Sequence, residues 1–141
     1  MKVVLDTNVW VSAWLWRGIP GNFIHLARRK EIIICTSEPL LTELENTLSY
    51  QKLQKKIQSL NFTKEQLLIG TREITNIYSI TELNIPELRD PDDNIILATA
   101  LASNADVIIT GDQDLLTLVE YQKIPIMTAN TFLNTYFEHN N

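Results

Sequence analysis

The chain has 141 residues, of which 45% are hydrophobic and 21% are charged, a composition that predicts one globular domain over residues 1–141 and argues against disorder. Its one cysteine, Cys35, excludes an internal disulfide and suits a reducing cytoplasm, and no uncharged apolar run approaches the roughly 20 residues of a membrane-spanning helix. With a net charge of −5, the chain lacks broad electrostatic attraction to nucleic acid, although metal ions can neutralise a local acidic site.

Short β-branched runs alternate along the chain with longer segments of helical pattern. We expect strands over residues 2–5, 31–35, 78–83, 107–110 and 125–128. We expect helices over residues 8–16, 20–30, 37–49, 92–102 and 130–138, one or two more within 51–77, and a short one from residue 112. This alternation predicts an α/β domain with a mainly parallel sheet between helices.

Three of these helices carry further signals. Ser37 is a plausible N-cap, and Thr63 with Gln66 matches the capping-box pattern. The 92–102 segment is apolar nearly all round, which predicts a buried helix.

Acidic residues follow two of the predicted strands. Asp6 comes directly after 2–5, and Asp112 and Asp114 come just after 107–110. Parallel strands bring their carboxyl ends to one edge of the sheet, which is where open α/β sheets bind ligands. We therefore expect these carboxylates to converge.

Two helices supply further acids. Glu43 lies at the border of the leucine face of the 37–49 helix, so its carboxylate can point into a cleft, whereas Glu45 should be solvated. Asp90, Asp92 and Asp93 open the apolar 92–102 helix. Taken singly, each acid could be a cap or a turn residue, since Asp is common in both. Four or more carboxylates in one cleft would repel one another, and hard divalent cations are the usual compensation.

Other chemistries find little support. His25 and His139 show no zinc-ligand spacing, and no nucleophile elbow, Walker loop or dinucleotide-binding glycine motif is present. Gly111 favours a tight turn rather than a phosphate cradle, and Cys35 is most simply a small buried side chain.

The order of these motifs resembles that of PIN domains. The segments that carry the resemblance are VVLDTNVWVS, SEPLLTEL and RDPDDNIILATALASNADVIITGDQDLL, and the likeness extends from residue 2 to about residue 133. Within that family the chain is similar to the bacterial toxin ribonucleases of VapC-like toxin–antitoxin pairs. The resemblance implies a three-layer α/β/α sandwich, Mg²⁺- or Mn²⁺-dependent cleavage of single-stranded RNA, a homodimer and, for a toxin, a small antitoxin protein as inhibitor.

The resemblance also assigns roles to individual residues. The family's four principal acids correspond to Asp6, Glu43, Asp93 and Asp112, which are expected to hold one or two ions and carry catalysis, and Asp114 is an additional metal ligand. Two polar residues, Asn8 and Thr110, are expected to orient carboxylates or the substrate phosphate. Leu115 stands where the family often has phenylalanine, a mild departure that leaves the carboxylates in place.

Two other functions remain open at this point. A Mg²⁺-dependent phosphatase or phosphotransferase also places Asp after its first strand, but Asn8 occupies the place of the second acid of a DxD motif. The alternative is a non-catalytic binding module on the same fold, against which the full set of acids argues.

Basic and aromatic clusters have simpler interpretations. Residues 28–30 and the lysines at 52, 55 and 56 are expected to be solvated helix faces rather than an RNA track. Trp10, Trp14 and Trp16 are expected to pack in the core, and any exposed part of them would mark a surface for a dimer partner or an antitoxin.

Overall fold

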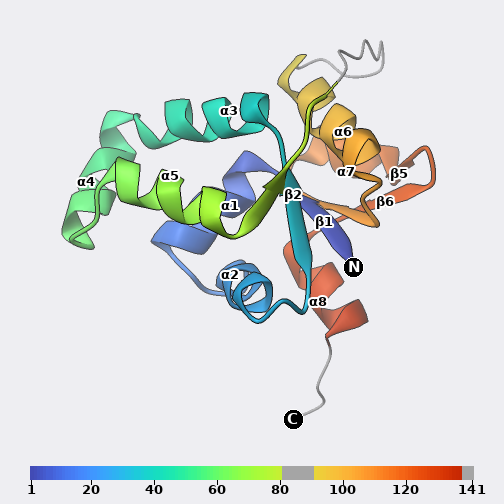
Figure 1. Cartoon of the computed structure of the whole chain (residues 1–141), viewed down its shortest axis with the longest axis horizontal. Coiled ribbons are helices and arrows are strands. Elements are labelled where there is room, and N and C mark those ends of the chain that lie inside the picture. Colours follow the sequence, from blue (N-terminus) through green and yellow to red (C-terminus); the bar gives the residue numbers. More distant parts are fainter. Residues whose placement is uncertain (81–90, 138–141) are drawn as a thin grey trace.

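A sheet of mainly parallel strands forms the middle layer of the protein (Figure 1). The computed structural model describes residues 1–80 and 91–137, with the side chains of Pro91 and Asp92 excepted. Among these residues the strands pair in the order β3-β2-β1-β4-β6-β5. Their bounds are β1 (Lys2–Leu5), β2 (Ile33–Thr36), β3 (Thr75–Ile77), β4 (Val107–Ile109), β5 (Glu120–Tyr121) and β6 (Ile124–Met127). Only the β5–β6 pair of this set is antiparallel.

Helices connect the strands and cover both faces of the sheet. Their bounds are α1 (Thr7–Leu15), α2 (Gly21–Arg28), α3 (Glu38–Leu48), α4 (Gln51–Ser59), α5 (Lys64–Glu73), α6 (Pro91–Ser103), α7 (Gln113–Leu118) and α8 (Ala129–Tyr136). The predicted caps are confirmed: the Ser37 hydroxyl accepts from the backbone of Leu40, and Thr63 and Gln66 form a capping box. Among the described residues, no helix has both the length and the apolar composition needed to cross a bilayer.

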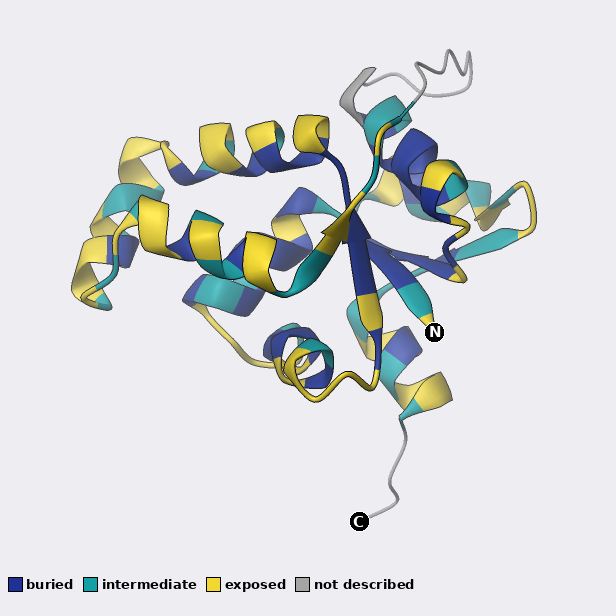
Figure 2. Cartoon of the chain, in the orientation of Figure 1, coloured by how far each residue is buried: buried dark blue, intermediate teal, exposed yellow. Residues whose placement is uncertain are grey.

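Each face of the sheet has its own buried core. Successive side chains of β1 point to opposite faces, so Val3 and Leu5 pack on one side and Val4 packs on the other. The first core joins the sheet to α1, α2 and α8, and the second joins it to α6 and α7. Figure 2 shows the buried central strands between helices whose outer surfaces are exposed. The predicted three-layer α/β/α sandwich is therefore confirmed.

Helices α3, α4 and α5 extend to one side of the sheet (Figure 1). We call them the α3–α5 arm. The arm packs on the first core through Leu48, Ile57 and Leu67, which are at most 3% exposed. Two polar contacts fix α5: Arg72 makes two 2.8 Å hydrogen bonds to Glu38 on α3, and the Trp14 indole N–H of α1 donates to Thr71 over 2.9 Å.

Some predicted bounds are wrong. The strand expected over 78–83 lies instead at Thr75–Ile77, where a helix had been expected, and residues 81–83 are outside the described part of the chain. The short strand β5 was not predicted. Asp90 and Arg89 are also outside the described residues, as is residue 138 at the end of the last predicted helix. The remaining ends differ from expectation by a few residues at most, which is common at frayed termini.

The strand order creates a ligand crevice. From β1 the chain proceeds to β2 and β3 on one side, whereas β4 and β6 lie on the other. The connections that leave β1 and β4 therefore diverge, and a crevice opens at the carboxyl ends of these two strands. Asp6 follows β1, and Thr110 and Asp112 follow β4, so the fold brings these residues to the crevice.

Candidate functional site

Asp6 is held rigidly at the carboxyl end of β1. Its backbone N–H donates to the carbonyl of Ile109 over 2.9 Å, which extends the β1–β4 pairing by one residue. Its Oδ1 caps α1 by accepting from the Thr7 N–H over 2.8 Å. Its Oδ2 accepts from the Thr110 hydroxyl over 2.6 Å. Contacts from two neighbouring strand ends thus fix both carboxylate oxygens.

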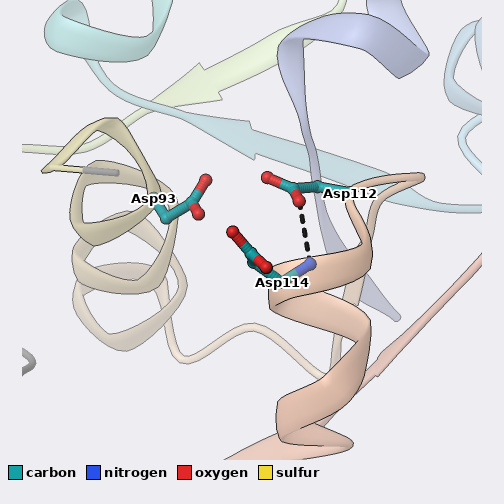
Figure 3. Close-up of side chains that lie close together, drawn as sticks. All are labelled: Asp93, Asp112 and Asp114. Atoms are coloured by element: carbon teal, nitrogen blue, oxygen red, sulfur yellow. Dashed lines mark hydrogen bonds between the residues drawn. The ribbon is translucent and has the colours of Figure 1, made fainter. Parts of the chain in front are cut away.

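Thr110 connects Asp6 to the acids that follow β4. The Thr110 side chain is buried, and its hydroxyl also accepts from the Asp112 N–H over 3.0 Å. Asp112 in turn caps α7, because its Oδ1 accepts from the Asp114 N–H over 2.9 Å (Figure 3). The caps that the sequence suggested as alternatives are therefore real, but they also aim the carboxylates at the crevice.

Glu43 reaches the same place from α3. The leucine face of this helix is buried, and Glu43 is half-buried at its border. Its Oε1 accepts a hydrogen bond from the Thr7 hydroxyl. The start of α3 is tied to α6 by a 2.8 Å hydrogen bond between Ser37 and Thr99. These contacts place Glu43 relative to both the start of α1 and α6.

Asp93 lies in the first turn of α6 and is only 6% exposed. Its carboxylate lies close to those of Asp112 and Asp114, and one oxygen from each of the three lies within 4.8 Å of the others (Figure 3). Asp114 is the most exposed member of this group. Asp6 and Glu43 stand outside this tight group as it is found among the described residues.

One cleft of about 260 Å³ joins these side chains. We call it the acidic cleft; it is lined by Asp6, Thr7, Asn8, Glu43, Asn46, Thr47, Tyr50, Asp93 and Asp112. Four of the five acids singled out from the sequence thus line a single cleft. The fifth, Asp114, has a carboxylate oxygen within 4.8 Å of those of Asp93 and Asp112. Asn8 is exposed at the cleft, whereas Thr110 lies behind it as the hydrogen-bond donor to Asp6.

The donor set fits a hard divalent cation. Carboxylates this close repel one another, and a cation between them removes that cost. Every ligand atom of the group is a carboxylate oxygen, which suits Mg²⁺ or Mn²⁺, and neither histidine nor cysteine joins it among the described residues. The residues present therefore fit the ion that the resemblance implies.

Other candidate residues lie away from the cleft. Cys35 is buried in β2, and burial raises the pKa of its thiol, so it is a packing residue. Glu45 is exposed, 3.9 Å from Lys64. The basic clusters at 28–30 and at 52, 55 and 56 do not line the acidic cleft. A Cβ at Gly111 would meet nothing within 4 Å, so close packing against the described residues does not require glycine at this position.

Four lining residues were not singled out from the sequence. They are Thr7, Asn46, Thr47 and Tyr50. The last three follow Glu43 by three, four and seven positions, which is the spacing of one helix face. That spacing was a usable signal once Glu43 had been placed at the cleft.

A second hollow of about 440 Å³ lies between α1, α2 and the α3–α5 arm. We call it the apolar groove; it is lined by Ala13, Trp14, Arg17, Gly21, Ile24, His25, Arg28, Phe62, Gln66, Leu67, Ile69, Gly70 and Glu73. The expectation of a tryptophan core holds for Trp10, which is 3% exposed. Trp14 is half-buried in the groove, and Trp16 is 55% exposed with the Lys56 ammonium over its ring.

Comparisons with known proteins agree with this architecture. The fold is similar to a chain in the crystal structure of VapBC2 from Rickettsia felis bound to a DNA fragment from their promoter. The TM-score is 0.61 at 21% sequence identity, and the alignment covers 89% of this chain and 97% of that one. A search of curated proteins found no significant match. The family model for the PIN domain matches residues 2–114, a range that contains all five acids of the site. Because this match spans far more than half of the chain, the protein belongs to the PIN domain family.

Proposed function

We propose that this protein is an endoribonuclease that hydrolyses phosphodiester bonds of single-stranded RNA with the help of Mg²⁺ or Mn²⁺. The observation that carries the proposal is the convergence of acids from four segments of the chain on one cleft at the switch point of the sheet. Acids that served only as caps and turns would have no reason to face one another across a shared space.

The acids divide into two groups by their surroundings. Asp93, Asp112 and Asp114 are close enough to share a cation, and Asp6 and Glu43 line the same cleft outside this group. A divalent ion, when bound, supplies positive charge for the phosphate and lowers the pKa of water. The hydroxyls of Thr7 and Thr110 hold Glu43 and Asp6 in place, which limits the reorganisation needed when substrate binds.

The exposed residues that line the cleft are the ones available to contact the RNA substrate. The amide of Asn8 is exposed there and can donate to a phosphate oxygen. In the overall reaction the oxygen of water bonds to phosphorus, the bond from phosphorus to the ribose oxygen breaks, and that oxygen takes a proton. A carboxylate of the acidic cleft would accept the proton that this water loses.

The direct test uses the purified protein, a labelled single-stranded RNA and a small phosphoester. We expect the RNA to be cut with Mg²⁺ and spared with EDTA. Asp6→Asn and Asp93→Asn keep the shape of the side chain, and Asn at position 6 still caps α1. Each should lower the cleavage rate by more than the roughly 10–100-fold that loss of an outer contact to a metal ligand costs. Undiminished cleavage in both variants, or hydrolysis of the phosphoester in place of RNA, would contradict the proposal.

We further propose that the protein is the toxin of a toxin–antitoxin pair and that the apolar groove receives its antitoxin. The fold similarity to a chain of a VapBC complex supports a partner of this kind. Arg17 and Arg28 stand at the groove, and neither has a carboxylate within 4.0 Å among the described residues. The fitting partner segment presents apolar side chains flanked by carboxylates.

Co-purification with the protein encoded beside this chain's gene tests the groove. Ile69 is 58% exposed, so Ile69→Asp should preserve the fold and abolish co-purification, and Arg28→Glu should weaken it. Val119→Asp is the control, because Val119 is 67% exposed and lies outside the groove. Equal co-purification of all three variants would contradict the groove assignment. The expected homodimer is tested separately, by the sedimentation coefficient of the purified protein.

A further inference from the structure

The acidic cleft has a neutral extension along α3. Asn46 and Thr47 continue the helix face of Glu43, Tyr50 follows the end of α3 as the N-cap of α4, and all three line the same cleft. The last turn of α3 separates Glu43 from Tyr50. The cleft therefore leads from a carboxylate-rich end to an end with an aromatic ring, an amide and a hydroxyl.

Tyr50 presents its ring at the end of this extension. It is 63% exposed, and it is the one aromatic residue among those that line the cleft in the described part of the chain. Its hydroxyl makes no hydrogen bond and its ring no aromatic pair with another described residue. By contrast, Phe132 on α8 packs against three other rings. A single exposed aromatic residue is common on protein surfaces. Because Tyr50 lines the acidic cleft, its ring can contact a ligand that occupies the cleft.

The backbone of Tyr50 is fixed although its side chain is exposed. Its N–H donates to Thr47 over 3.1 Å, and its carbonyl accepts from the N–H groups of Leu53 and Gln54, each over 2.9 Å. The Gln54 side chain also donates to the carbonyl of Leu48 over 2.9 Å, which ties the start of α4 to the end of α3. The ring is thus mounted on a rigid turn, so a stacked ligand need not order the backbone.

We infer that Tyr50, together with the amide of Asn46, forms a nucleobase-binding subsite beside the acidic cleft. Aromatic side chains stack on the faces of unpaired bases, and an amide can donate to and accept from a base edge. The subsite binds a base near the phosphate that occupies the acidic end. The inference rests on the proposed ribonuclease function and adds which part of the RNA the end of α3 and the turn after it recognise.

The test combines changes in the protein with changes in the RNA. Cleavage kinetics and fluorescence anisotropy are measured with a labelled oligouridylate, and with oligomers that carry one abasic nucleotide at successive positions. Tyr50→Ala should weaken binding and raise KM about tenfold, the size of one base stack on an aromatic ring, with a smaller change in kcat. Tyr50→Phe and Tyr50→Trp should retain wild-type values. Tyr136→Ala is the control, because Tyr136 is 42% exposed on α8 and does not line the cleft.

The abasic oligomers assign the contact. At one position the abasic nucleotide should raise the KM of the wild-type protein by the same factor of about ten. On that oligomer Tyr50→Ala should have the same KM as wild type. If wild-type protein cuts RNA and Tyr50→Ala matches it on every oligomer, the subsite is overturned while the ribonuclease function stands. If wild-type protein neither binds nor cuts RNA, the proposed function fails, and the subsite fails with it. If Tyr50→Ala unfolds, the abasic series on wild-type protein still tests for a bound base, and equal binding and cleavage of every oligomer would overturn the subsite.

Discussion

Asp112→Asn should make the metal-free protein more stable, although it removes a residue of the site. The substitution keeps the shape of the side chain, and asparagine still accepts the Asp114 N–H as the N-cap of α7. What it removes is one negative charge within 4.8 Å of the carboxylates of Asp93 and Asp114. The stability of the free protein therefore reports on the repulsion inside the cluster.

The magnitude follows from this separation. Two unit charges 4.8 Å apart repel by about 0.9 kcal/mol in water and by about 3.5 kcal/mol at the effective dielectric constant of a protein surface. Asp112 is half-buried and Asp114 is exposed, so the lower value is the better guide. Relief of two such repulsions should raise the free energy of unfolding by about 2 kcal/mol and the melting temperature by about 5 °C.

Urea and thermal unfolding in EDTA, and then across a Mg²⁺ titration, measure this effect. An ion that binds only the folded state at 100 times its Kd adds about 2.7 kcal/mol to the free energy of unfolding. We expect this gain in the wild-type protein and its loss in Asp112→Asn, so that Mg²⁺ reverses the order of stability. Glu120→Gln, at an exposed acid on β5, should change neither value. A variant less stable than wild type in EDTA, or equal stabilisation of both by Mg²⁺, would refute the reasoning.

Three further predictions concern residues around the sheet. Thr110→Val removes a buried hydroxyl that donates to Asp6 over 2.6 Å, and it leaves the Asp112 N–H without its acceptor. The free energy of unfolding in urea should therefore fall by about 2–3 kcal/mol. A fall of less than about 0.5 kcal/mol would contradict these hydrogen bonds. The buried Cys35 thiol, whose pKa is raised by burial, should react with a disulfide reagent only at the rate of unfolding, and immediate reaction would show that it is accessible. The hydrogen bonds from Arg72 hold the pKa of Glu38 below its usual range, so this pair should stabilise the protein fully above the ordinary carboxyl pKa and lose its effect as the pH falls through the lowered value. Because both side chains are exposed, Glu38→Gln should cost less than about 1 kcal/mol at pH 7, and a larger loss would contradict this.

The central strands and the acidic side of the site could be predicted from the sequence. The runs at 2–5, 31–35 and 107–110 are short, apolar and β-branched, a pattern that fits strands buried on both faces. Because such strands are parallel, the acids after two of them were expected at one edge. The structure places Asp6 and Asp112 in one cleft at this edge, although they are far apart in the sequence.

The edges of the sheet were harder to predict. The pairing of β3 with β2 involves Thr75, Asn76 and Ile77, so this edge strand has a single apolar residue and no apolar run. The hairpin between β5 and β6 turns at Gln122 and Lys123, which both have positive φ values. Asn-Gly or Asp-Gly is the usual signal for such a turn, so a Gln-Lys turn gave none. In both places the strand conformation depends on pairing with a neighbouring strand, because the local sequence has only a weak preference for it.

The neutral side of the cleft was missed for a different reason. Asn46, Thr47 and Tyr50 carry no charge, and polar or exposed residues on a helix ordinarily face solvent. Their importance depends on the direction in which α3 crosses the crevice, and that direction is set by the packing of its leucine face and by the Ser37–Thr99 hydrogen bond. The spacing from Glu43 identifies these residues only after distant contacts have placed Glu43 at the cleft.

The most direct test of the central claim compares two acids of the same helix. Glu43 faces the acidic cleft and Glu45, two residues later, is exposed to solvent. The single-turnover rate of single-stranded RNA cleavage is measured for wild type, Glu43→Gln and Glu45→Gln at increasing Mg²⁺ concentrations. Wild type and Glu45→Gln should show the same Mg²⁺-dependent rate, whereas Glu43→Gln should lose cleavage or require much more Mg²⁺. Equal rates in the two variants, or cleavage that proceeds in EDTA, would contradict a metal-dependent site built from these carboxylates.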